Sequence, residues 1–205
     1  MHRPRSRFPL GPVAWATGGP SLTRLYTRAG DHGETGLPGG ARVLKDTRRI
    51  EAFGSFDELG AHLGVAEATL PPTASEVRAV LLRLQHELYI AQSEIAAAPP
   101  ASPPTHRIEE RQVRRIEAEL DYYTLMIEPL RSFVLPRGSP AGAQLHVCRA
   151  VARRAERALW SLHRESPQRA ELLQWANRLS DLLFALALSV NKLEGVGEVA
   201  PDYTV

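Results

Sequence analysis

Apolar residues recur every three or four positions through five long segments of the chain, and this spacing restricts the fold more than any other feature. The interval places apolar side chains on one face of an α-helix. Helices are predicted over about 55–70, 74–97, 105–127, 141–163 and 168–192. No segment longer than a few residues alternates as a strand would. Because the helices are long and most connections are short, the sequence predicts an all-α protein, an antiparallel five-helix bundle.

Local signals suggest where these helices begin and end. Ser55 and Glu58 match an S-x-x-E capping box, which predicts a helix start near Ser55. Pro71 and Pro72 are expected to end that helix. After the proline-rich stretch 99–104, Thr105 is the predicted cap of the third helix.

Length and composition exclude several classes of protein. The 205 residues suffice for one domain with a full core. The net charge of +2 does not call for nucleic acid, and no apolar run approaches the roughly 20 residues that span a membrane. The single cysteine, Cys148, precludes an intrachain disulfide and fits a reducing compartment. Its place among apolar residues favours a core side chain over a nucleophile.

The two ends of the chain are expected to lie outside the bundle. Residues 1–22 contain arginine, glycine and proline but no acid. This pattern fits a flexible tail, a misassigned start or an organelle-targeting leader. We expect a flexible tail and a cytoplasmic protein; a leader would instead direct the protein to an organelle matrix. The folded domain is predicted to span 23–193, with a C-terminal tail at 194–205.

The fourth predicted helix carries a row of arginines. At 100° per residue, Arg149, Arg153 and Glu156 fall within about 60° of one another around the helix axis. Arg154 and Arg157 extend the row, and an apolar stripe runs beside it. Half-buried guanidinium groups suit a polyphosphate, because each offers forked donors to phosphate oxygens. The alternative is a solvated or salt-bridged helix face.

Two further stretches have the chemistry of a nucleotide site. The loop at 26–46 is rich in glycine, threonine and charge, although it lacks the spacing of a Walker A loop and a plain surface loop is the alternative. On the last helix, Asn177 and Asp181 lie one turn apart on the same face. Asn177 suits an adenine edge, and a polar contact between helices is the alternative.

Motifs for other chemistries are missing. The seven histidines show no H-x-x-x-H pair and no acid at metal spacing, so no zinc or iron site built by the protein is expected. Neither a G-x-S-x-G elbow nor a cysteine nucleophile motif is present. The three stretches together therefore favour an anionic nucleotide as ligand over base-catalysed hydrolysis.

The chain resembles the PduO-type ATP:cob(I)alamin adenosyltransferases from about Thr23 to Asn191. The likeness rests on motifs in the family's order: YTRAGDHG (26–33), RVLKD (42–46), IEAFGSFDEL (50–59), FVLP (133–136), HVCRAVARRAER (146–157) and NRLSD (177–181). The resemblance implies a ferritin-like five-helix bundle, a homotrimer with substrates at subunit interfaces, and an ATP-binding loop at 26–46. The implied reaction moves the 5′-deoxyadenosyl group of ATP to the cobalt of cob(I)alamin, releasing triphosphate.

The resemblance also implies roles for individual residues. The implied ATP-binding residues are Thr27, Arg28, Ala29, Gly30, Thr35, Gly36, Lys45, Arg153, Arg154, Glu156, Arg157 and Asn177. Catalytic roles are implied for Arg153, Glu156 and Phe133, with Phe133 filling the lower face of the corrin ring. Asp57 and Arg149 are implied to form a salt bridge between subunits.

Mg²⁺ is implied to accompany ATP, with Glu156 as its candidate protein ligand and no metal site built by side chains alone. Implied partners are a reductase and an enzyme that accepts adenosylcobalamin, with no nucleic acid and no membrane. Departures from the family pattern are Arg28, Glu34, Ala41 and Arg137. Two other hypotheses stay open: a non-catalytic nucleotide or corrinoid carrier, and a structural or nucleic-acid-binding helical bundle.

Overall fold

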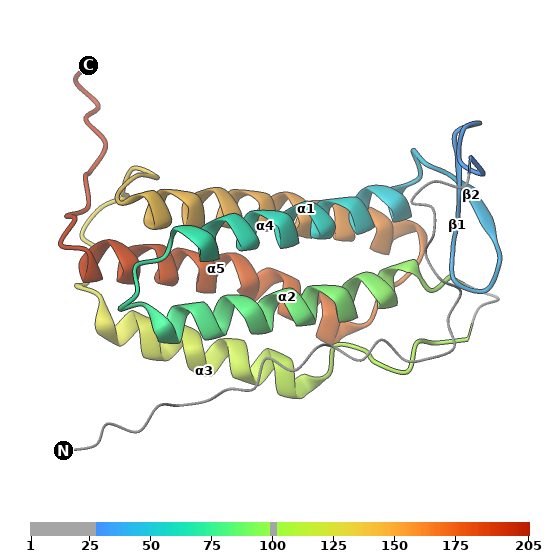
Figure 1. The fold of residues 1–205 in the computed structure, drawn as a ribbon, viewed down its shortest axis with the longest axis horizontal. Helices are drawn as coiled ribbons and strands as arrows, with labels where there is room; N and C mark the ends of the chain where they lie inside the picture. The colour runs from blue at the N-terminus through green and yellow to red at the C-terminus, as the bar shows by residue number, and fades with distance from the viewer. Residues whose placement is uncertain (1–27, 99–101) are drawn as a thin grey trace.

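The computed structural model describes residues 28–98 and 102–205. Within them, five long helices follow a two-stranded antiparallel sheet (Figure 1). The elements are β1 (Glu34–Gly36), β2 (Arg42–Leu44), α1 (Arg48–Thr69), α2 (Ser75–Ala96), α3 (Glu110–Met126), α4 (Pro140–Glu165) and α5 (Ala170–Leu193). Successive helices alternate in direction, which confirms the predicted antiparallel five-helix bundle.

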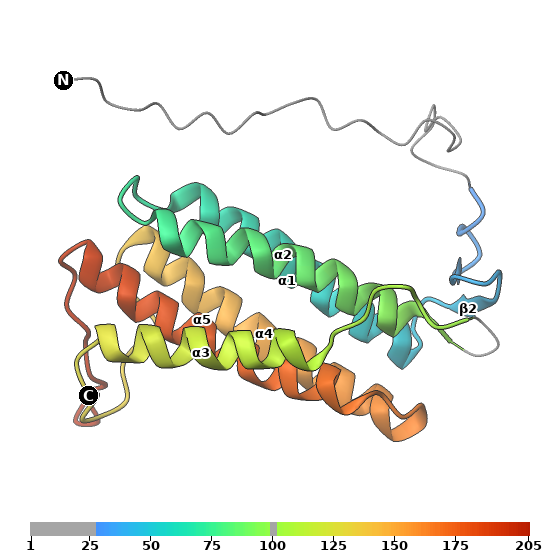
Figure 2. The same ribbon diagram turned by 90° about the horizontal axis from the view of Figure 1, so that it is seen from below.

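The core of the bundle is organised around α5. This helix packs against α2, α3 and α4, while α1 packs against α2 and α4 (Figure 2). Most of α5 is apolar and buried, as expected for a helix surrounded by others. Trp175 is fully buried, stacks on Phe56 of α1 with ring centroids 6.1 Å apart, and donates a hydrogen bond of 3.0 Å to Glu87. None of the described helices is long and apolar enough to cross a membrane.

Two predicted helix starts are wrong. Helix α1 begins at Arg48, so Ser55 is a buried residue inside the helix and not its cap. The extra turns are held by tertiary contacts, because Arg49 donates to the carbonyl oxygen of Ile95 and to Ser166 Oγ. Helix α3 begins at Glu110, where Glu109 and Gln112 form the capping box, and Thr105 has no such role. The bounds of α2, α4 and α5 agree with the prediction within two residues.

The structure describes the predicted C-terminal tail but not the predicted N-terminal tail. Residues 1–22, Thr27 and part of the proline-rich stretch at 99–101 lie outside the described residues. Residues 194–205 are described: the part up to Ala200 lies beside the loop between α3 and α4, where the Leu135 N–H donates to the Val199 carbonyl over 2.8 Å, while Tyr203 and Val205 are largely exposed. The predicted ATP-binding loop contains the β-hairpin, in which Thr35 pairs with Val43.

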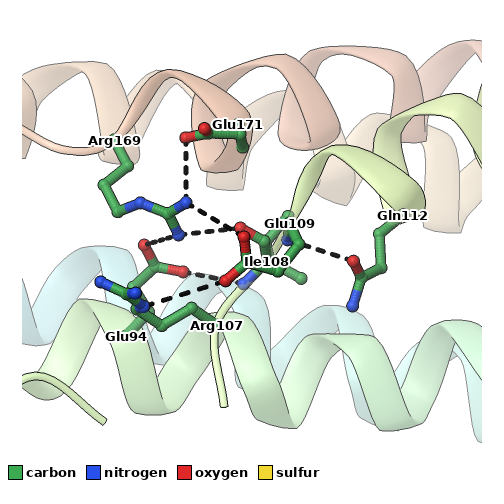
Figure 3. A network of polar contacts seen from close by, with 7 residues as sticks. All are labelled: Glu94, Arg107, Ile108, Glu109, Gln112, Arg169 and Glu171. Carbon is green, nitrogen blue, oxygen red and sulfur yellow. Dashed lines mark hydrogen bonds and ion pairs between the residues drawn. The ribbon is translucent and has the colours of Figure 1, made fainter. Parts of the chain in front are cut away.

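A polar network around Arg169 ties α5 to the segment that enters α3 (Figure 3). Its guanidinium donates to Glu94 on α2 over 3.2 Å and to the carbonyl oxygen of Ile108 over 2.9 Å. Glu94 in turn accepts the Ile108 N–H over 3.0 Å. Glu94 is 8% exposed and Ile108 is fully buried, so the network satisfies polar groups that water does not reach.

Arg169→Ala is therefore expected to lower the free energy of unfolding by about 2 kcal/mol, because it leaves the buried Glu94 carboxylate without its cation. Urea unfolding measures the change. Arg164→Ala is the matched control, since Arg164 is exposed on α4. Equal stability of the two variants would show that the network contributes nothing to folding.

Candidate functional site

A cleft of about 680 Å³ lies where the loop between α3 and α4 meets α4 and α5. The loop contributes Phe133, whose side chain is 82% exposed. The other lining residues with polar or aromatic side chains include His146, Arg149, Arg153, Ser180, Asp181 and Phe184. The cleft thus brings together four predicted positions that lie up to 48 residues apart in sequence, from Phe133 to Asp181.

The start of α4 sets the direction of the arginines. Ser139 is its N-cap and accepts the Gly142 N–H over 3.0 Å, and Pro140 occupies the first turn. From this fixed start, Arg149 and Arg153 follow one turn apart and both reach the cleft. The Arg149 guanidinium carbon lies 5.9 Å from the centroid of the Phe184 ring, a cation–π contact.

Two polar groups at this cleft are buried without a partner among the described residues. They are Arg149 Nε and the ring nitrogens of His146, a residue that is 2% exposed. Burial, together with the positive charge of Arg149, lowers the pKa of His146 to about 4. His146 is therefore a neutral imidazole at physiological pH, with one donor and one acceptor nitrogen.

This buried histidine predicts a pH-dependent stability. The unfolded chain binds a proton on His146 near its ordinary pKa of 6.5, whereas the folded chain resists protonation down to about 4. The unfolded state then binds more protons in that window, so the free energy of unfolding should fall as pH drops from about 6.5 to about 4, by up to about 3 kcal/mol. Urea unfolding across this range should show a flatter profile for His146→Leu but not for His86→Gln, at an exposed histidine. Equal slopes in His146→Leu and the parent would contradict the assignment.

The remaining arginines of the row differ in their contacts. Arg154 forms an ion pair with Glu58 of α1, so at this position the salt-bridged interpretation holds. Arg157 donates to the backbone carbonyl of Arg153 over 3.2 Å. Within the described part of the chain, the guanidinium of Arg153 itself has no hydrogen bond or ion pair. Its guanidinium is therefore open to a ligand.

Next to the cleft, Glu156 on α4 accepts a hydrogen bond of 2.9 Å from Asn177 on α5. Asn177 also accepts from Arg178 over 3.2 Å, so it forms the polar contact between helices that was the alternative to adenine binding. Burial, and then the charge of Glu156, raise the pKa of Asp181, while Arg153 and Arg178 oppose the shift. Arg153, Glu156, Asn177 and Asp181 therefore form one cluster of interacting polar side chains.

The glycine-rich loop lies at the other end of the molecule (Figure 1). Thr35, Gly36 and Lys45 line a second cleft, of about 790 Å³, together with residues of α1 and α2. Lys45 Nζ donates to the Gly30 carbonyl over 2.9 Å, and Arg42 donates to that of Ala29 over 2.6 Å.

Three of the departures from the family pattern, Arg28, Glu34 and Ala41, also lie in this loop. Arg28 has a φ of 61°, which is uncommon for a residue other than glycine. Glu34 is ion-paired with Arg42 over 3.0 Å, so its negative charge is balanced within the hairpin.

Within the described residues, the glycine-rich loop ends near the end of α4, about two helical turns beyond the arginine row. An ion pair of 3.0 Å between Arg48 and Glu165 fixes the start of α1 beside the end of α4. Arg157 lies eight residues before Glu165, which is about 12 Å along the helix axis, and Arg153 lies further still. Asp57 and Arg149 are not ion-paired within the described residues either; Asp57 is exposed on α1 and lines a separate hollow.

Sequence reasoning missed His146 and Phe184 as cleft residues. A signal for Phe184 was present, since it lies three residues after Asp181 and hence on the same side of α5. His146 likewise precedes Arg149 by three residues on α4. Groups of three or more potential metal ligands are not found among the described residues.

Comparisons with known proteins identify the family. The chain matches a family model described as "Cobalamin adenosyltransferase" over residues 25–190. It is 40% identical over 181 residues to the "Cobalamin adenosyltransferase" of Cupriavidus metallidurans, which covers 88% of this chain and 95% of that protein. Identity to the "Corrinoid adenosyltransferase" of Bacillus subtilis is 38% over 178 residues, covering 86% and 91%.

A solved structure has the same fold. A variant of the PduO-type ATP:corrinoid adenosyltransferase from Lactobacillus reuteri, complexed with cobalamin and ATP, superposes with a TM-score of 0.84 at 28% identity. The match covers 88% of this chain and 97% of that chain. With a fold, a family model and full-length relatives in agreement, this chain belongs to the cobalamin adenosyltransferase family.

Proposed function

We propose that this protein transfers the 5′-deoxyadenosyl group of ATP to the cobalt of cob(I)alamin, giving adenosylcobalamin and triphosphate. The observation that carries the proposal is the 680 Å³ cleft, where an exposed aromatic ring meets two arginines that have no ion-pair partner among the described residues. A large apolar ring suits one face of a corrin, and a free guanidinium such as that of Arg153 suits a polyphosphate. The names of full-length relatives point to the same reaction.

The chemistry needs positioning more than acid–base groups. Cobalt(I) is itself a strong nucleophile; its electron pair attacks C5′ of ATP, a cobalt–carbon bond forms, and the C5′–O bond breaks. That bonding pair leaves with the triphosphate. The protein has to hold C5′ in line with cobalt and stabilise the charge that develops on the leaving group. In this scheme Arg153 binds the triphosphate and Phe133 lies below the corrin ring.

The distance between the glycine-rich loop and the arginine row supports sites shared between copies of the chain. The loop residues Arg28, Ala29, Gly30, Thr35, Gly36 and Lys45, with Thr27, would contact the triphosphate from one subunit. Arg153, Arg154, Glu156, Arg157 and Asn177 would complete the site from the next. A homotrimer in which Asp57 of one subunit pairs with Arg149 of another would meet this requirement. It would also give the unpartnered Arg149 Nε an acceptor.

Mg²⁺ would be held chiefly by the phosphates of ATP, and Glu156 offers a carboxylate beside the arginines. A reductase that supplies cobalt(I) and an adenosylcobalamin-dependent enzyme that takes the product complete the proposal. A cytoplasmic location fits the buried free thiol of Cys148.

The test is an anaerobic mixture of the purified protein with ATP, Mg²⁺ and chemically reduced cobalamin, followed by visible spectroscopy. Loss of the cob(I)alamin band, with appearance of light-sensitive adenosylcobalamin, is the expected result. Tight binding of both ligands without any product would instead support the carrier hypothesis. Weak binding that lacks nucleotide specificity and depends steeply on salt would support a structural or nucleic-acid-binding helical bundle.

A further inference from the structure

Asn191 occupies the last turn of α5 and is fully buried. Its side-chain amide makes three hydrogen bonds to three different parts of the chain. Oδ1 accepts the Ser139 N–H over 3.0 Å, at the N-cap of α4. Nδ2 donates to the Arg137 carbonyl over 3.0 Å and to Glu198 Oε1 of the C-terminal segment over 2.9 Å.

The packing around this amide leaves no room for another arrangement. A Cβ added at Gly138 would come within 2.1 Å of Asn191 Oδ1, and one at Gly142 within 1.9 Å. Gly138 has a φ of 137°, a conformation that other residues rarely adopt. Glycine at both positions thus allows the loop and the first turn of α4 to close directly on the Asn191 side chain.

The loop that carries Phe133 has few other fixed points. Residues 130–132 and 134 line the 680 Å³ cleft on one side and a second hollow of about 470 Å³ on the other. Val196, Gly197 and Glu198 of the C-terminal segment form part of the far wall of that hollow. With open space on both sides, close packing cannot set the position of this loop. The hydrogen bonds at its end do so: those of Asn191, and the one from Leu135 to Val199.

We propose that Asn191 is a positioning residue for adenosyl transfer: it joins the loop, the start of α4 and the C-terminal segment into one unit and so presents Phe133 to the corrinoid. This inference rests on the proposed function. Asn191 itself does not line the cleft, so it acts through the loop and not on substrate.

The isosteric variant Asn191→Asp separates hydrogen bonding from packing. It keeps the volume and the acceptor for Ser139 but places an oxygen against the Arg137 carbonyl and the Glu198 carboxylate. We expect kcat to fall about 10- to 100-fold, since small misplacements of reacting groups have effects of this size, while KM for ATP changes less than about twofold. A ring that excludes an axial ligand from the lower face of the corrin leaves cob(II)alamin four-coordinate. The spectral signature of this four-coordinate cob(II)alamin, measured with ATP bound, should therefore weaken in parallel.

A second substitution is expected to restore part of the activity. Glu198→Gln in the Asn191→Asp background supplies an amide donor to the new carboxylate oxygen, so kcat and the four-coordinate signal should both recover. Gly197→Ala is the matched control in the same segment, because a Cβ there meets nothing within 4 Å. It should leave kcat, KM and the signal unchanged. Circular dichroism and thermal unfolding establish that each variant is folded.

Each outcome decides the question. Parent-like kcat and spectrum in Asn191→Asp would overturn the inference, and so would a fall that Glu198→Gln does not reverse. If Asn191→Asp does not fold, Glu198→Ala replaces it, since it removes one bond from a partly exposed residue; an unchanged four-coordinate signal there also overturns the inference. Failure of the proposed function would look different, because the parent protein would itself form no adenosylcobalamin.

Discussion

Arg153→Ala should reduce adenosylcobalamin formation by at least about 100-fold and leave the fold intact. A loss of this size is expected because removing one preorganised donor to a developing anion lowers kcat on that scale. The guanidinium lies on the cleft and, within the described part of the chain, has no hydrogen bond or ion pair that its loss would break. The free energy of unfolding should therefore change by no more than about 0.5 kcal/mol. Steady-state kinetics and urea unfolding of the same preparation test both halves of the prediction.

Two further variants separate the role of the Arg153 side chain from the effect of its charge. Arg153→Lys keeps the charge but loses the planar fork, so its rate should lie between those of the parent and the alanine variant. Arg164→Ala removes an exposed arginine from the last turn of the same helix and should leave the rate unchanged. Retained activity in Arg153→Ala would count heavily against the assignment of this residue, and an equal loss in Arg164→Ala would point to overall charge.

The helices were predictable because their cause is local. The apolar spacing that indicated α5 continues through Trp175, Leu179 and Leu186, all of which are fully buried. The start of α1 was not predictable in this way. It is set by contacts of Arg49 with the end of α2 and with Ser166, residues that are distant in sequence. Although Ser55 and Glu58 match a capping box, α1 does not begin there, because these contacts hold an earlier start.

In the candidate site, too, some features follow from local helix geometry and others depend on packing between elements. Arg149 and Arg153 share one side of α4 because of helix geometry alone, so their common cleft follows from the sequence. The pairing of Arg154 with Glu58 does not, because it depends on how α1 packs against α4. Asn191 escaped notice for the same reason: in the sequence it is one polar residue at a helix end, and its role appears only when the loop and the C-terminal segment meet it.

Phe133→Ala is expected to keep binding of ATP and cobalamin but to lower the rate by roughly 10- to 100-fold. An aromatic ring below the corrin excludes water and an axial ligand, and a four-coordinate cobalt(II) is easier to reduce to the cobalt(I) nucleophile. The four-coordinate signal of cob(II)alamin should accordingly fade in this variant. Because the side chain is 82% exposed, its removal should hardly change the free energy of unfolding.

The control for Phe133 is Leu125→Ala on α3, which removes an even more exposed apolar side chain, at 85%, away from the cleft. It should retain the parent rate and spectrum, so a defect confined to Phe133→Ala reports on the corrin side and not on general loss of apolar surface. An unchanged rate in Phe133→Ala would remove the proposed role of this ring. Comparison with Asn191→Asp then separates the ring from its support: if Asn191 acts through Phe133, combining the two substitutions should lower kcat little further than Phe133→Ala alone.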